Sequence, residues 1–274
     1  MRTIYSVILN SYTMQKRHTD RAGYFAELAY TSEKYLMPYI GKFIEIDRGL
    51  SVLEVGCGDG GNLLPFSARA CRTVGIDISE NRIRDAVTFF EKKNAGGEFI
   101  RADVLELDGY DGSFDIVLCH DVIEHVGDKH SLLVRMARFL KPSGLLFVAF
   151  PAWQMPFGGH QQICRSRLLS HLPFIHLLPR PFYEALLVAG GESRECVAEL
   201  MSIRSSRITV EAFESLATRS GLTVKDRRLY LVNPHYEVKF GLEPRLLPGI
   251  LAGIPFVRNF FSTSCFYILQ DGNR

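Results

Sequence analysis

The sequence predicts an α/β fold built on a doubly wound, mostly parallel sheet of seven strands. Short apolar segments alternate with helix-like segments between residues 50 and 150. Runs such as Ile116-Val117-Leu118 are continuously apolar, which is typical of parallel strands that are covered on both faces. A glycine-rich loop follows the first of these strands. Right-handed crossovers between such strands give a doubly wound sheet, whose ligand lies beyond the carboxyl ends of the strands.

The N-terminal part is expected to be helical. Residues 20–46 repeat aromatic and aliphatic side chains at helical spacing, with a break near Pro38 and Gly41. Three tyrosines on this segment either cover a ligand or pack on the core: Tyr24, Tyr30 and Tyr35. Residues 1–12 contain only a short apolar run and no small-residue cleavage site, so no signal peptide is expected.

The remaining elements follow from apolar patterning and turn residues. Strands are expected near residues 50–55, 72–76, 98–101, 114–119 and 144–150, and helices near 62–70, 79–94 and 128–139. A further helix is expected at 209–221, with late strands at 222–232 and 263–269. Two insertions, 152–208 and 234–262, are then the candidates for selecting a substrate.

The first strand runs into a loop that is suited to a nucleotide-like cofactor. Residues 52–61 read Val-Leu-Glu-Val-Gly-Cys-Gly-Asp-Gly-Gly. Glycine permits positive φ angles and close approach of a ligand to backbone N–H groups at a helix N-terminus. The spacing G-x-G-x-x-G, with Asp77 following Gly56 by 21 residues, also fits a dinucleotide site. The glycines alone therefore leave the cofactor open.

Three other features distinguish between these cofactors. Glu54 precedes the first glycine by two residues, where a carboxylate would oppose a pyrophosphate but suits a cationic ligand. Asp103 follows the third expected strand and suits an adenine amino group. Residues 114–126 read as a fourth strand and the loop beyond it.

Five stretches resemble the class I S-adenosylmethionine-dependent methyltransferases, in the order and spacing of that family, over roughly residues 50–151. The stretches are 52–61, 74–79, 102–107, 114–126 and 140–148. The likeness is greatest to small-molecule methyltransferases of quinone, sugar and natural-product pathways. It implies a Rossmann-like sheet whose last strand is antiparallel, with N-terminal helices over the cofactor and S-adenosylhomocysteine as the product.

The resemblance implies roles at the methionine end of the cofactor. Glu54 would stabilise the methionine ammonium group, directly or through water. The backbone of Gly56, Cys57 and Gly58 would pass close to the methionine portion. His120, at the end of the fourth strand, would contact the same portion.

The resemblance also assigns residues to the adenosine portion. Asp77 would accept hydrogen bonds from the two ribose hydroxyls, each worth roughly 1.5–3 kcal/mol as a charged bond. Ile78 would pack on the adenine ring. Asp103 would accept from the adenine amino group, and the Val104 N–H would donate to the ring.

Two histidines are candidates for the catalytic base, because histidine titrates in the range needed to accept an acceptor proton. His125 follows the fourth strand, and His160 lies in a glycine-containing loop after the fifth. The alternative for each is a structural histidine, and no base is needed if the acceptor is already ionised. His235 and Tyr236 are weaker candidates.

Composition limits the partners. A net charge of +2 gives no reason to expect a nucleic-acid partner. The six cysteines are scattered without a C-x-x-C pair, so we expect reduced thiols in a cytoplasmic protein and no metal site. No run of eighteen apolar residues is present, so no transmembrane segment is expected. Residues 168–189 read as an amphipathic lid, a peripheral membrane contact or ordinary packing.

We therefore interpret the chain as one structural domain with three parts: a helical cap at 1–48, a cofactor-binding core at 49–151 and 209–274, and a lid at 152–208. The predicted function is methyl transfer to a small molecule, at an oxygen of a sugar, phenol, quinone or natural-product-like acceptor. Nucleic-acid amino-methyltransferases of this fold carry an Asn/Asp-Pro-Pro-aromatic motif after the fourth strand. This chain has Cys119-His120-Asp121-Val122 at that place, which argues against methylation of a nucleic-acid base. The alternatives are a non-catalytic cofactor-binding module and an NAD-dependent oxidoreductase.

Overall fold

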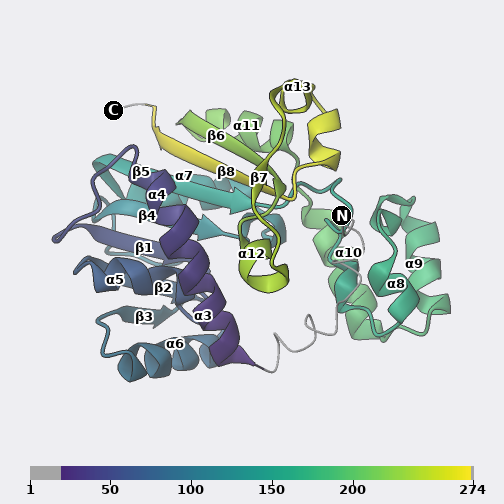
Figure 1. The fold of residues 1–274 in the computed structure, drawn as a ribbon, viewed down its shortest axis with the longest axis horizontal. Coiled ribbons are helices and arrows are strands. Elements are labelled where there is room, and N and C mark those ends of the chain that lie inside the picture. The colour runs from purple at the N-terminus through teal and green to yellow at the C-terminus, as the bar shows by residue number, and fades with distance from the viewer. Residues whose placement is uncertain (1–19, 273–274) are drawn as a thin grey trace.

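One twisted eight-stranded sheet forms the centre of the protein, with helices on both of its faces (Figure 1). The computed structural model describes residues 20–272, so the expectation for residues 1–12 falls outside the described part. The strand order is β3-β2-β1-β4-β5-β8-β6-β7. The strands are β1 (Ser51–Val55), β2 (Arg72–Asp77), β3 (Glu98–Arg101), β4 (Phe114–His120), β5 (Leu140–Phe150), β6 (Leu222–Val232), β7 (Arg245–Leu246) and β8 (Ser264–Asp271).

The pairing confirms the predicted fold class. β3, β2, β1, β4 and β5 are parallel neighbours, and β8 runs antiparallel between β5 and β6. The sheet has one strand more than the seven predicted: β7, which has two residues and pairs antiparallel with β6 at the edge of the sheet. The sequence did not predict it, because two residues are too few to show the period-2 alternation of a strand.

Alternate residues of each central strand enter separate cores on the two faces of the sheet. Val117 and Cys119 pack with helices α7 (Lys129–Phe139) and α11 (Val210–Arg219). Ile116 and Leu118 pack in the other core. That core also includes buried side chains from the N-terminal helices, from α5 (Leu64–Ala68) and from α6 (Glu80–Lys92). Both faces of the parallel strands are thus buried, as their continuous apolar runs predicted.

The N-terminal helical region is one nearly continuous rod that crosses in front of the sheet in the view of Figure 1. α3 (Arg21–Thr31) begins at Asp20, whose carboxylate accepts a hydrogen bond from the Gly23 N–H at 2.8 Å. A π-helical turn, η1 (Ser32–Leu36), joins α3 to α4 (Met37–Ile40). The predicted break is therefore a widened turn that precedes Pro38, whose missing N–H would disrupt a regular helix interior.

The two insertions fold into helices at the carboxyl-end side of the sheet. Residues 152–208 contain η4 (Gln161–Ile163), α8 (Arg167–His171), η5 (Ile175–Leu177), α9 (Arg180–Ala189) and α10 (Arg194–Ser206). α8, α9 and α10 form a lobe with its own small core (Figure 1). Residues 234–262 contain α12 (His235–Phe240), β7, α13 (Gly249–Ala252) and η6 (Val257–Phe260).

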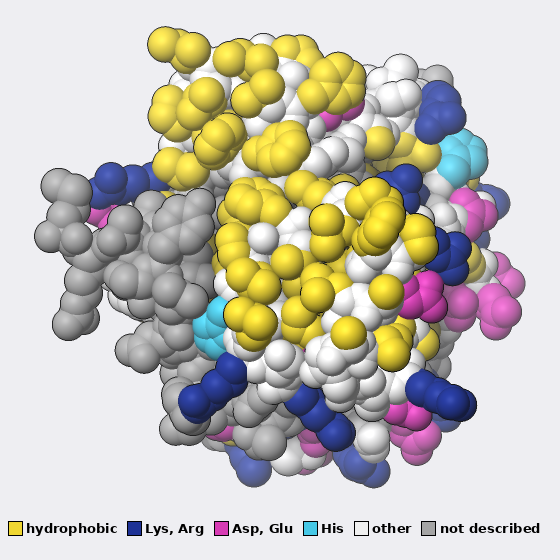
Figure 2. All heavy atoms as spheres, turned by 90° about the vertical axis from the view of Figure 1, so that its right-hand side faces the viewer, with side chains coloured by type: hydrophobic (Ala, Val, Ile, Leu, Met, Phe, Trp, Pro, Cys, Tyr) yellow, Lys and Arg dark blue, Asp and Glu magenta, His cyan; other side chains and the backbone are white. Residues whose placement is uncertain are grey.

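The lobe and the α13–η6 segment share an exposed apolar face, which Figure 2 shows as a broad hydrophobic surface. Phe182 is 68% exposed, Ile250 84% and Phe256 69%. The rings of Phe174 and Phe260 lie 6.4 Å apart and connect the two parts of this face. Within residues 20–272, no helix is both long and apolar enough to cross a bilayer.

Candidate functional site

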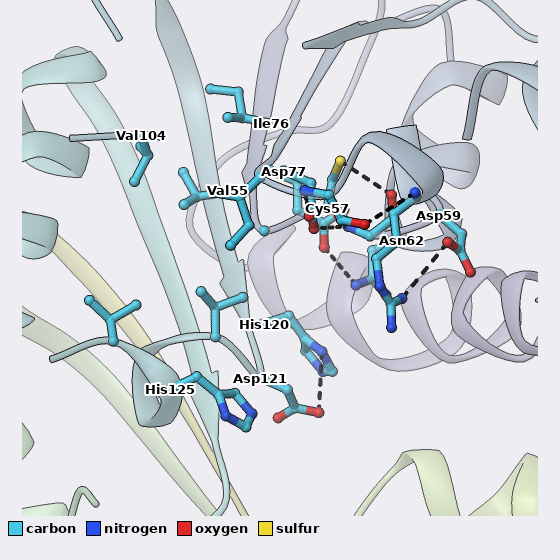
Figure 3. A pocket seen from close by; sticks show the side chains of 18 of the residues that line it. Val55, Cys57, Asp59, Asn62, Ile76, Asp77, Val104, His120, Asp121 and His125 are labelled. Carbon is cyan, nitrogen blue, oxygen red and sulfur yellow. Dashed lines mark hydrogen bonds and ion pairs between the residues drawn. The ribbon is translucent and has the colours of Figure 1, made fainter. Parts of the chain in front are cut away.

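A cavity of about 750 Å³ lies beyond the carboxyl ends of β1, β2 and β4, where doubly wound sheets hold their ligands. Four polar or glycine positions from separate segments reach it, as the sequence predicted: Gly56, Asp77, Asp103 and His120. All nine residues predicted to bind the cofactor line this cavity. Figure 3 shows the side chains of most of its walls.

The glycine loop turns sharply around the end of β1. Gly56, Gly58 and Gly60 have φ angles of 69°, 52° and 82°, in the left-handed region that favours glycine. A Cβ on Gly56 would lie 2.4 Å from Cγ2 of Val122. The N–H groups of Gly56 and Cys57 both donate to the carbonyl of Ile76, at 2.7 and 3.0 Å. The loop is therefore fixed to β2 and exposes its far side to the cavity.

Glu54 is a buried carboxyl group on the cavity wall, 1% exposed. Its Oε1 accepts a hydrogen bond from Nδ2 of Asn62 at 2.7 Å, whereas Oε2 has no partner among the described residues. Burial raises the pKa of Glu54 to about 8, the Asn62 hydrogen bond lowers it in part, and the charge of Asp77 raises it further. A cation in the cavity would satisfy this orphaned oxygen and favour ionisation.

Asp77 has a second task that the sequence did not reveal. Its Oδ2 accepts from the Gly58 N–H at 2.9 Å, and its Oδ1 accepts from the Ser79 N–H at 2.8 Å. The carboxylate thus connects the glycine loop to the start of α6, while each oxygen keeps a lone pair for a ligand. Beside it, Ile78 is 73% exposed although it is apolar, which is suited to covering a flat ring.

Two other residues predicted to contact the cofactor, Asp103 and His120, also line the cavity. Asp103 is exposed and its Oδ1 accepts from the Leu105 N–H at 2.9 Å. The His120 ring stacks nearly parallel to Phe147, with centroids 6.5 Å apart, and its Nδ1 lies 3.6 Å from Oδ2 of Asp121. Figure 3 shows His120, Asp121 and His125 together on one side of the cavity.

Two acidic or amide residues of the loop have roles that sequence reasoning missed. Asp59 lines the cavity, is 1% exposed and pairs with Arg21 and Arg82. The following 3₁₀ turn begins at Gly60 without a side-chain cap. Asn62 holds Glu54, and no sequence motif signals that contact.

Of the three tyrosines proposed to cover the ligand or pack on the core, one reaches the cavity and two do not. Tyr24 lines the cavity. Tyr30 and Tyr35 are absent from its lining; both lie beside Lys34, and Tyr35 also donates a hydrogen bond to Glu237. The helical spacing placed all three on one element but did not decide which faces the ligand.

The structure brings the two candidate catalytic histidines together. Their ring centroids are 4.9 Å apart and their planes are perpendicular. His125 lines the cavity, and His160 stands behind it outside the lining. Burial lowers the pKa of His125 and lowers that of His160 to about 4. His235, by contrast, lies in α12 within 3.0 Å of the Thr31 hydroxyl and does not line the cavity.

Residues 53–148 match the family described as "Methyltransferase domain", which covers the glycine loop and the strands around the cavity. This part of the chain is a methyltransferase domain. The match confirms the predicted resemblance to S-adenosylmethionine-dependent methyltransferases. The roles of individual residues remain predictions.

Curated relatives match a stretch of about 100 residues. A ubiquinone biosynthesis O-methyltransferase of Rickettsia akari is 30% identical over 100 residues, which are 36% of this chain and 39% of that protein. The enzyme of the same name from Rhodopseudomonas palustris is 38% identical over 102 residues, or 37% and 40% of the two chains. The chain spans about two fifths of the length of these relatives.

Solved structures extend the likeness to most of the fold. A putative sarcosine dimethylglycine methyltransferase from Galdieria sulphuraria superposes with a TM-score of 0.58 at 14% identity, covering 88% of this chain and 85% of that one. Magnesium protoporphyrin IX methyltransferase from Synechocystis PCC 6803, solved with bound SAH, gives 0.53 at 14% identity, with 91% and 83% covered. At these identities the likeness concerns the fold, which agrees with the predicted class.

Proposed function

We propose that this chain is an enzyme that transfers a methyl group from S-adenosylmethionine to an oxygen of a small-molecule acceptor in the cytoplasm. The carrying observation is the buried carboxyl of Glu54 on the cavity wall of the methyltransferase domain, with one oxygen lacking a partner. When bound, the cofactor supplies a sulfonium methyl that passes to the acceptor oxygen, leaving S-adenosylhomocysteine and a proton. The acceptor classes are those expected above: sugars, phenols or quinones, and natural products.

The residues around Glu54 fit the methionine end of this cofactor. The carboxylate would bind the ammonium group, and the backbone of Gly56, Cys57 and Gly58, which lines the cavity, would pass close to the methionine portion. His120 is held on Phe147 and faces the same end of the cavity. Rigid placement of this kind contributes on the order of 7–11 kcal/mol to an in-line displacement when both reactants are aligned.

The adenosine end is assigned to residues at and just beyond the ends of β2 and β3. Asp77 would accept from the ribose hydroxyls with the lone pairs that its two backbone contacts leave free. Ile78 would cover the adenine with its exposed side chain. Asp103 and the backbone of Val104 would contact the adenine edge.

The acceptor is placed beside the histidine pair. His125 would face the acceptor and accept its proton, with His160 orienting the ring from behind. Their lowered pKa values keep both imidazoles neutral at physiological pH, the form able to accept a proton. In this proposal residues 1–48 form the cap, 49–151 and 209–274 form the core, and 152–208 form the lid, which brings His160 to His125 of the core.

Transfer of a labelled methyl group tests the proposal. Purified protein is incubated with methyl-labelled cofactor and a metabolite extract, and the small-molecule fraction is counted. We expect label in that fraction with wild-type protein and a large loss with His125→Ala. Cofactor binding without any transfer would favour a non-catalytic module instead. Binding of NAD would favour the oxidoreductase, although Glu54 opposes a pyrophosphate.

We also propose that the exposed apolar face of the lobe and of α13–η6 rests against a membrane surface. Large apolar side chains at high exposure are typical of such contacts. In sedimentation with vesicles of phosphatidylcholine and phosphatidylglycerol, we expect Phe182→Ser and Phe256→Ser to reduce bound protein several-fold. Val87→Ser, at an exposed position on α6, is the matched control. Equal sedimentation of all variants would contradict this contact.

A further inference from the structure

Glu124 is a buried carboxyl group that the proposed cofactor site does not use. Its side chain lies in the 3₁₀ turn η3 (Ile123–His125), and the residue is 4% exposed. Neither carboxylate oxygen has a hydrogen-bond partner among residues 20–272. The charge of Lys129 acts on it, but the Lys129 ammonium donates to the carbonyl of Val126 at 2.5 Å. A carboxylate buried without hydrogen bonds is costly, so a missing cation is the simplest chemical complement.

Two imidazoles converge on this carboxyl group. Nε2 of His125 lies 3.7 Å from Oε1 of Glu124, and the His160 ring stands perpendicular to that of His125. One ligand atom from each of Glu124, His125 and His160 lies within 4.8 Å of the other two. Ligand atoms bound to one ion at about 2.1 Å lie roughly 3–4 Å apart, so a small rotation of the side chains would close the set.

The backbone at two of the surrounding positions is held in an unusual conformation. His160 has a φ of 57° and Asp121 a φ of 54°, both in the left-handed region that residues other than glycine seldom adopt. Such conformations concentrate at functional sites. The charge of Asp121 acts on Glu124, His125 and His160, and its carboxylate lines the cofactor cavity. Asp121 therefore lies near the histidine cluster and lines the cavity together with His125.

We propose that Glu124, His125 and His160 bind a divalent transition-metal ion at the wall of the cofactor cavity, with Asp121 as a neighbouring oxygen donor. Two imidazoles with carboxylates suit Zn²⁺, Co²⁺, Mn²⁺ or Fe²⁺ rather than Ca²⁺. With the ion bound, His125 would be a metal ligand, and the metal would lower the pKa of the acceptor hydroxyl that it holds; without the ion, His125 would act as the base proposed above. Resting on the proposed function, this inference narrows the acceptor to a hydroxyl beside a second oxygen able to chelate the ion.

Titration of chelator-treated, metal-free protein with Co²⁺ tests the site without cofactor or acceptor. We expect one equivalent to bind, with d–d absorption and no thiolate charge-transfer band, and Zn²⁺ to displace it. Glu124→Gln and His160→Ala should each weaken Co²⁺ binding at least tenfold. Unfolding of the metal-free variants serves as the folding control, because Glu124→Gln removes no hydrogen bond of the described residues and should not lower the melting temperature.

A second group provides the matched control. Cys164, Glu192 and Cys196 also come within 4.8 Å, but the Glu192 oxygens accept from the Arg165 and Ser166 N–H groups at 3.0 and 2.9 Å. Cys196→Ser should leave Co²⁺ binding unchanged. Wild-type affinity in His160→Ala and Glu124→Gln, or a thiolate band that Cys196→Ser removes, would overturn the proposal. S-adenosylhomocysteine binding is measured separately, so failure of the metal site is distinguishable from failure of the methyltransferase proposal.

Discussion

Asp77→Ala is expected to weaken S-adenosylhomocysteine binding at least tenfold, or about 1.4 kcal/mol, while the protein stays folded. Two losses act together. The ribose hydroxyls lose a charged acceptor, and the N–H groups of Gly58 and Ser79 lose the carboxylate that holds them. Because the helix that follows keeps its Ser79 side-chain cap to Arg82, the fold does not depend on Asp77 alone. Isothermal titration of the variant measures the loss.

Two further variants separate the contributions of Asp77. Asp77→Asn keeps an oxygen acceptor of similar shape but no charge, so an intermediate loss is expected. Glu80→Ala changes an exposed acid next to the site, which pairs only with Arg101 among the ion pairs of the described residues, and should bind normally. Wild-type affinity in Asp77→Ala would remove this residue from the ribose site.

Glu54→Gln is expected to change stability and binding in opposite directions at pH 8. The pKa of Glu54 is raised from 4.5 to about 8 in the folded, cofactor-free protein. Between these values the unfolded chain ionises while the folded chain keeps its proton, so the free energy of unfolding falls as pH rises. The slope approaches about 1.4 kcal/mol per pH unit for this one group. Gln has no proton to lose, so the free energy of unfolding of the variant does not fall with pH through this position.

Binding shows the reverse. The ionised carboxylate is the form that attracts the methionine ammonium, so Glu54→Gln should weaken S-adenosylhomocysteine binding at least tenfold. In wild-type protein, the affinity for S-adenosylhomocysteine should rise as the pH rises toward 8. Binding should release the proton of Glu54 to the buffer, so the measured heat of binding should differ between buffers with different protonation enthalpies. Urea unfolding of wild type and variant from pH 5 to 8 measures the stability effect, with the exposed Glu98→Gln as control. Parallel unfolding curves for all three proteins would contradict the assigned ionisation.

The convergence of the cofactor residues was predictable because it follows from topology. Glu54, Asp77, Asp103 and His120 lie at or just beyond the ends of β1 to β4, and parallel strands bring their carboxyl ends to one edge. The apolar runs also predicted that both faces of the sheet are covered, whereas the antiparallel direction of the last strand followed from the family resemblance. These features depend on local patterns that repeat along the chain.

Contacts between insertions and the core were not predictable in the same way. His160 meets His125 only through the left-handed turn after β5, and 34 residues of the chain separate the two (160 minus 125, less one). Glu124 belongs to a recognisable stretch, yet its lack of a partner is visible only in three dimensions. Asp59 of the cofactor loop likewise forms an ion pair with Arg21 at the start of α3. Side-chain partners at long separation depend on packing that no local pattern encodes.

The most direct test is titration of the purified protein with S-adenosylhomocysteine, with NAD and NADH in parallel cells. The cavity, the orphaned oxygen of Glu54 and the methyltransferase domain predict micromolar binding of S-adenosylhomocysteine and no heat from either nicotinamide cofactor. Binding of NAD or NADH without binding of S-adenosylhomocysteine would contradict the proposed function. In that case the glycine loop would serve a dinucleotide.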